Sequence, residues 1–305
     1  MEETFRQFYN HTIYPELYRM ERRRKRLWFM LLGMGVLTML MFFGGIMLGM
    51  KGVIMLLLLP LVGYLGWIGN SLRKYVKLFK PRVVRLILDY IDNQLSYDTL
   101  HYYPEKGIPK KEFLKSGLYV TRADNYETED YISGRIGDVD FELCEVRISE
   151  LAGVQSGVRA VFSGIFFKAV FNRPVQGAFL IVPRDERARM NKSIKKFNLR
   201  GGKPVKVPEL EEFNEKFLIY RTLDASVSMT VSLAFCESIL NYYKMTGEYP
   251  AVFISGAGAY AVLPSTKDML EPSLFSSNLK FEKINDFYSD LTMLLDLIEE
   301  IDKMF

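Results

Sequence analysis

Residues 27–72 contain a single charged side chain, Lys51, which lies in a short glycine-containing break. A helix needs about 20 apolar residues to cross a hydrocarbon core roughly 30 Å thick. Residues 27–50 and 53–72 each meet that length. A break this short leaves no exposed backbone in lipid only if two helices turn at one membrane surface. The stretch therefore predicts a transmembrane helical hairpin with spans at 27–50 and 53–72.

A long buried hairpin in a soluble protein, or a signal peptide followed by one span, would also contain an apolar stretch. Uncharged runs of this length are unusual in core helices, and the apolar part of a cleavable signal is only about 7 to 15 residues long. Within the hairpin, small residues recur on one side of each helix. This pattern favours close packing of the two helices, or alternatively a homo-oligomer contact. The residues are Gly45, Gly49, Gly63, Gly66 and Gly69.

Basic residues flank the apolar stretch on both sides, whereas the break holds only Lys51. By the positive-inside rule, both termini and the main domain are expected to be cytoplasmic. The net charge of +4 is concentrated in these flanks, which favours attraction to anionic phospholipid and not binding to nucleic acid. The basic residues expected to face the membrane lipid are Arg22, Arg23, Arg24, Lys25, Arg26, Arg73, Lys74 and Lys77.

The segments on either side of the hairpin are expected to be helical. Residues 1–26 carry an aromatic stripe that suits a helix lying at the membrane interface, broken near Pro15. The alternative is packing of this stripe on the cytosolic domain. Residues 73–95 continue as a basic and then amphipathic stalk helix. The stripe consists of Phe5, Phe8, Tyr9, Ile13, Tyr14, Leu17 and Tyr18.

Residues 96–305 are expected to form one cytosolic α+β domain. Short apolar runs between turn signals at 113–183 predict antiparallel strands. The apolar alternation changes phase near Cys144 and Glu145, which predicts a β-bulge and hence a curled sheet or barrel. These expected strands include 118–122 and 176–182, and a turn is expected at 172–174. Residues 251–263 are expected to form two strands around Gly256.

Two segments of this domain are candidates for interaction. The connector at 184–206 is basic and is either a solvated surface or a lipid or partner surface. The C-terminal helix carries apolar residues at helical spacing, which pack either on the chain's own domain or on a partner or second copy. The candidate residues are Lys195, Lys196, Arg200 and Lys203 in the connector, and Leu291, Leu294, Ile298 and Ile301 in the helix.

The sequence contains little that supports catalysis. His11 and His101 are its only histidines, and no metalloprotease, hydrolase or phosphate-loop motif is present. Cys144 and Cys236, both in apolar segments, suit a reducing compartment and buried thiols. Acidic residues gather around Glu145, where paired carboxylates would bind a cation or share a proton, although a solvated strand face explains most of them. We expect no catalytic, cofactor-binding or metal-binding residue and no cofactor.

Four segments, FLKSGL at 113–118, DYISGRI at 130–136, FELCE at 141–145 and FSGIFF at 162–167, resemble an uncharacterised bacterial membrane-protein family. The resemblance implies a domain of unknown function with two N-terminal spans and a cytosolic β-rich part in the bacterial inner membrane. It also implies a possible partner, a LemA-like membrane protein. The curled sheet followed by a helix is similar to pleckstrin-homology-like domains, which is an analogy of fold only.

The sequence therefore favours a non-enzymatic, membrane-anchored interaction module that binds a protein partner or anionic lipid. One alternative is a membrane-bound enzyme that uses acidic residues near Glu145. The other is an oligomeric membrane scaffold.

Overall fold

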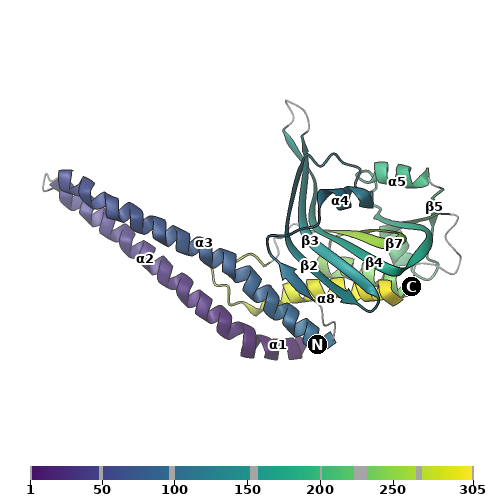
Figure 1. The fold of residues 1–305 in the computed structure, drawn as a ribbon, viewed down its shortest axis with the longest axis horizontal. Helices are drawn as coiled ribbons and strands as arrows, with labels where there is room; N and C mark the ends of the chain where they lie inside the picture. Colours follow the sequence, from purple (N-terminus) through teal and green to yellow (C-terminus); the bar gives the residue numbers. More distant parts are fainter. Residues whose placement is uncertain are drawn as a thin grey trace. The chain divides into compact units, whose positions relative to one another are not determined.

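The computed structural model describes residues 2–47, 51–95, 100–151, 157–199, 201–222, 232–265 and 270–303. The chain forms two compact units (Figure 1). The first comprises Met1–Tyr90 and Met269–Phe287, and the second comprises Ile91–Asp268 and Tyr288–Phe305.

The first unit is built on two long helices that lie side by side and run in opposite directions (Figure 1). Its elements are α1 (Glu2–Phe8), a π-helical turn η1 (Tyr9–Ile13), α2 (Tyr14–Met47) and most of α3 (Lys51–Leu95). The helix expected to break near Pro15 instead continues from the π-turn straight into α2. Arg82 of α3 and Glu16 of α2 form an ion pair of 3.4 Å, which joins the charged parts of the two helices.

Most of the apolar side chains of α2 beyond Trp28 lie on the surface. Phe29 is 75% exposed, Leu32 62% and Leu40 66%. Among the described residues, one helical segment, Thr4–Gly44, is long and apolar enough to cross a membrane. The second predicted span falls within α3, where the side chains of residues 51–59 are outside the described part.

The aromatic stripe of the N-terminal segment is largely buried. Phe5, Tyr9, Ile13 and Leu17 are each at most 3% exposed. The Phe5 ring packs on Tyr90 at 5.4 Å between centroids. An interfacial position of this face is therefore wrong, because its rings fill the core of the first unit. Tyr14 and Tyr18, at 40% and 53% exposure, lie outside that core.

The glycines expected to favour close packing of the two helices do not meet a neighbour where they are described. A methyl group added to Gly63, Gly66 or Gly69 would find no atom within 4 Å apart from its own helix backbone. Gly45 and Gly49 lie outside the residues whose side-chain surroundings are described.

The second unit contains, within the described residues, a seven-stranded antiparallel sheet with the order β1-β2-β3-β4-β6-β5, and with β7 paired to β4. Because β1 and β5 end the order, the sheet is open and a closed barrel is wrong. The α+β class is confirmed. The strands are β1 (His101–Tyr103), β2 (Asn125–Ile136), β3 (Val139–Leu151), β4 (Val158–Pro183), β5 (Lys203–Val205), β6 (Phe217–Arg221) and β7 (Ala251–Pro264).

Helices cover both faces of this sheet. Phe113 of α4 packs with Cys144, Val146 and Phe166 in one apolar core. The C-terminal helix α8 crosses the sheet on the other side (Figure 1). The Asp302 carboxylate of α8 accepts a hydrogen bond of 3.1 Å from the backbone N–H of Asp138, in the β2–β3 turn. The helices are α4 (Lys110–Ser116), α5 (Asn191–Asn198), α6 (Glu211–Lys216), α7 (Leu233–Thr246) and α8 (Phe281–Lys303).

The β-bulge predicted in β3 lies instead in the neighbouring strand. β3 pairs with β4 without a shift from Val139 to Ile148. β2 carries the extra residue, between Glu129 and Ile132, where Asp130 has a positive φ of 58°. The apolar pattern of β3 changes phase because different faces of the strand are covered along its length, so opposite faces are buried before and after Cys144.

Three other strand predictions are wrong. Residues 118–122 form an irregular segment after α4, not a strand. β4 runs through 172–174 without the expected turn, although its pairing with β7 shifts between Val170 and Ala178. β7 is one strand through Gly256, whose positive φ of 59° accommodates the irregularity without a reversal.

Candidate functional site

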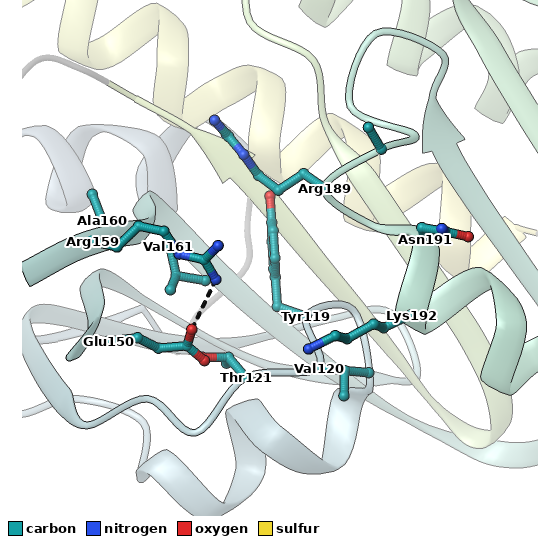
Figure 2. Close-up of a pocket in the computed structure, with 11 residues that line it drawn as sticks. Tyr119, Val120, Thr121, Glu150, Arg159, Ala160, Val161, Arg189, Asn191 and Lys192 are labelled. Carbon is teal, nitrogen blue, oxygen red and sulfur yellow. Dashed lines mark hydrogen bonds and ion pairs between the residues drawn. The ribbon is translucent and has the colours of Figure 1, made fainter. Parts of the chain in front are cut away.

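A polar cavity of about 460 Å³ lies where the end of β3, the start of β4 and the N-terminal end of α5 meet (Figure 2). This volume is within the usual range for small-ligand pockets, about 300–1,000 Å³. It carries three cationic side chains and one carboxylate. We call it the β3–α5 pocket, and its lining residues are Tyr119, Val120, Thr121, Glu150, Arg159, Ala160, Val161, Ala188, Arg189, Asn191 and Lys192.

The sheet side of the pocket holds a cross-strand ion pair. The register places Glu150 directly opposite Arg159, and the Arg159 guanidinium donates to the Glu150 carboxylate at 2.9 Å. The same carboxylate accepts bonds from the Thr121 hydroxyl at 2.6 Å and the Arg122 backbone N–H at 2.8 Å. These donors favour the charged form and lower the pKa of Glu150 to about 2. Glu150 is therefore an ionised, structurally engaged carboxylate at neutral pH.

The helix side of the pocket is positively charged. Arg189 is 61% exposed and pairs with Glu186 at 3.1 Å. Within the described part of the chain, Lys192 has no carboxylate partner, and Figure 2 shows its ammonium pointing from α5 into the pocket. Ser193, the next residue, donates to the backbone carbonyl of Leu118 at 2.8 Å, which fixes α5 against the segment that carries Tyr119.

Tyr119 forms the floor between the two sides (Figure 2). Burial raises the pKa of its phenol to about 12, so the hydroxyl stays protonated at neutral pH. It is a neutral hydrogen-bonding group beside Arg189, not a base. The pocket thus combines a neutral hydroxyl with exposed cations, an arrangement that suits binding of a phosphate-like or carboxylate anion.

A second polar cluster lies at the bulge of β2. One carboxylate oxygen from each of Glu129, Asp130 and Glu145 lies within 4.8 Å of the other two. Arg147 contacts both Glu129, at 3.0 Å, and Glu145, at 2.6 Å. The Tyr102 hydroxyl donates to Asp130 at 2.5 Å. Glu145 is 5% exposed, so this carboxylate is buried beside the bulge.

The chemistry of this acidic cluster is largely accounted for by its neighbours. Arg147 supplies positive charge to two of the carboxylates, which is what a buried carboxylate requires whether or not it has another role. Cys144, adjacent in sequence, is wholly buried, and burial raises the pKa of its thiol to about 12. A protonated, inaccessible thiol is not a nucleophile.

The basic residues predicted to face the membrane divide into two groups. Arg24 is 5% exposed, pairs with Glu21 at 2.6 Å and donates to the Leu274 carbonyl, so a lipid-facing role for it is wrong. Its charge is needed to balance a buried glutamate. The others are exposed: Arg22, Arg23, Lys25, Arg26, Arg73, Lys74 and Lys77.

The candidate interaction residues differ in their exposure to solvent. Lys195, Lys196 and Lys203 are exposed, and Arg200 lies outside the described residues. Leu291, Leu294, Ile298 and Ile301 are at most 4% exposed, so they pack within the chain and offer no surface to a partner.

No sequence pattern pointed to the β3–α5 pocket. The only signal was the pair of opposite charges, Glu150 and Arg159, near the ends of two consecutive strands.

The C-terminal part of the chain is similar to known sequences. Residues 160–303 match a family described as a protein of unknown function, DUF3137. The resemblance to a domain of unknown function is thus confirmed for that range, which includes 162–167 but not the three earlier segments. Two membrane helices and a LemA-like partner stay predictions. No curated protein matches the chain.

Proposed function

We propose that this protein is a non-enzymatic binding module anchored in the membrane by a two-helix hairpin, and that its α+β domain binds an anionic group in the β3–α5 pocket. The observation that carries the anchoring is the exposed apolar surface of α2. The first span of the hairpin is residues 27–50, which begins within α2. The second span is residues 53–72, within α3. Both termini face the cytoplasm, and the host membrane is a bacterial inner membrane.

The exposure of α2 supports a membrane in preference to a soluble core. A core helix buries its apolar side chains, yet only 6% of the most apolar stretch of Thr4–Gly44 is buried. Soluble proteins rarely expose apolar patches of more than a few hundred Å². On α3, Val62 and Trp67, at 66% and 52% exposure, add to the same kind of surface. A lipid environment removes this surface from water on both helices.

The pocket supports an anionic ligand because its fixed negative charge is already engaged. Glu150 has three donors, including Arg159, whereas Lys192 points into the cavity without a carboxylate partner among the described residues. A phosphate monoester would bring the charge that complements Lys192 and Arg189. Three sources offer such a phosphate: a phospholipid headgroup, a phosphorylated protein partner and a free metabolite. The pocket would recognise the phosphate group in the same way in all three.

An enzyme acting through Glu145 is the second candidate. The clustering of Glu129, Asp130 and Glu145 favours it, since three carboxylates suit a divalent cation. The ion pairs of Arg147 weigh against it, because a cation bound there would have to displace or tolerate the guanidinium. A LemA-like partner and a homo-oligomeric scaffold are further proposals, and no surface within the described ranges singles out either of them.

Binding is tested with the full chain in nanodiscs of neutral lipid, by titrating inorganic phosphate, a short-chain phosphatidic acid and a phosphoserine peptide separately. We expect slowed amide exchange at 119–121 and 188–192 with the preferred source. Lys192→Gln should lower affinity by about ten- to a hundredfold, since a charge-assisted hydrogen bond contributes about 1.5–3 kcal/mol. Lys195→Gln is the matched control, because Lys195 is exposed on the same helix but does not line the pocket.

Equal losses in the Lys192 and Lys195 variants would show general surface electrostatics and contradict a built site. No protection of the pocket segments by any of the three probes would contradict anion binding altogether. A preference for phosphatidic acid over the other two would identify the membrane as the source of the ligand.

A further inference from the structure

We infer that residues 270–280 form an interfacial loop, and that Phe275 at its tip contacts the headgroup region of the membrane beside Trp28. This inference rests on the membrane anchoring proposed above and adds to it a second, non-contiguous contact with lipid. The partner surface it commits to is the lipid–water interface. All the contacts that carry it lie within the first unit.

The loop is joined to α2 at the start of the apolar stretch. The backbone carbonyl of Leu274 accepts a hydrogen bond of 2.7 Å from the Trp28 indole N–H and another from the Arg24 guanidinium. The Phe275 ring packs on the Trp28 ring with 5.2 Å between centroids. The loop tip is thus fixed at the height of residue 28 along α2.

Further bonds hold the base of the loop against the helices. Asn278, which is 2% exposed, donates to the Tyr75 hydroxyl at 3.0 Å. Its side-chain oxygen accepts from the Ser273 backbone N–H at 2.8 Å. Glu271 pairs with Lys80 at 3.1 Å, and the Tyr9 hydroxyl donates to the Leu279 carbonyl at 2.9 Å. Because anchors flank Phe275 on both sides, the position of its ring follows from the packing of the unit.

Residue 28 marks the boundary between the charged and the apolar parts of α2. The last charged residue before the span is Arg26, and Phe29 is already 75% exposed on an apolar surface. Trp and Tyr gather at this level in membrane proteins because their rings are apolar and their polar atoms need a partner. The Trp28 indole N–H is satisfied by Leu274.

Phe275 is the exposed member of this arrangement. Its side chain is 82% exposed although phenylalanine is among the residues most often buried. The ring is held against Trp28, next to the exposed apolar part of α2, so the medium that covers that part of α2 would also bury Phe275. In the proposed hairpin, that medium is lipid.

The test uses Phe275→Cys labelled with an environment-sensitive fluorophore, in the full chain reconstituted with lipids that carry a headgroup quencher. Native Cys144 and Cys236 are wholly buried and do not compete for the label. The same label at Phe29→Cys reports whether the proposed first span lies in the membrane. Arg85→Cys is the control outside it, about 20 Å further along α3 from residue 72 at about 1.5 Å per residue. Ser276→Cys repeats the measurement with the Phe275 ring intact.

We expect the label at 275, and at 276, to be quenched comparably to that at 29 and severalfold more than that at 85. Quenching at 29 without quenching at 275 and 276 would overturn the interfacial loop and leave the anchoring intact. No quenching at 29 would overturn the anchoring itself, and the loop with it.

Discussion

Replacing both Leu40 and Leu65 by arginine is expected to shift the protein from the carbonate-resistant membrane fraction to the soluble or aggregated fraction. Each leucine lies near the middle of a proposed span and is exposed, by 66% and 42% respectively. Exchanging leucine for arginine at the centre of a membrane helix costs about 3–4 kcal/mol in apparent insertion free energy, or a factor of at least about a hundred. The measurement is the fraction of full-length chain that resists alkaline carbonate extraction.

The matched control is the same exchange at two exposed leucines outside the spans. Leu78 is 58% exposed on α3 beyond the second span, and Leu199 is 90% exposed just after α5. We expect this variant to fractionate as the unmodified chain does. If the two double variants behaved alike, the exposed apolar surface of α2 and α3 would not be a membrane surface.

The second large effect is expected from Phe113→Ala in the α+β domain. Phe113 is fully buried, and its ring lies 4.9 Å from that of Phe166 and 6.0 Å from that of Tyr126. Removing a buried aromatic ring leaves a cavity and typically lowers the free energy of unfolding by about 3–5 kcal/mol. The slowest amides of β3 and β4 should then exchange about a hundredfold to a few thousandfold faster.

Hydrogen exchange followed by mass spectrometry reads this change in the domain without interference from the membrane part. Met245→Ala, at a side chain that is 65% exposed on α7, is the control and should leave exchange of the same strands nearly unchanged. An unchanged protection of β3 and β4 in Phe113→Ala would mean that the α4 core does not stabilise the sheet.

Periodicity predicted the elements whose environment is uniform along their length. The long helices and the C-terminal helix α8 follow from apolar spacing, because each presents one consistent face or surface to its surroundings. The sequence also drew attention to Glu145, since a charged residue stands where the apolar alternation of β3 changes phase.

The errors arise where tertiary contacts decide. The phase change of β3 comes from burial of opposite faces before and after Cys144, which one strand's sequence does not distinguish from a bulge. The N-terminal aromatic stripe has the composition of an interfacial helix, but its partners, Tyr90 and Phe281, are far away in sequence. Aromatic composition alone does not tell lipid from a protein core.

The β3–α5 pocket was beyond prediction for the same reason. Glu150 and Arg159 come from a hairpin, Tyr119 from an irregular segment, and Lys192 from a helix in a basic connector. Each residue alone resembles an ordinary solvated side chain. What makes them a candidate site is that the hydrogen bond between Ser193 and the Leu118 carbonyl brings the segment and the helix together.

Side-specific thiol labelling in oriented membrane vesicles tests the two-span anchor most directly. Lys51→Cys, in the break between the spans, and Arg85→Cys, after the second span, are each treated with a reagent that does not cross membranes. We predict labelling of residue 51 only from the external side and of residue 85 only from the cytoplasmic side. Labelling of both positions from the same side would contradict the hairpin.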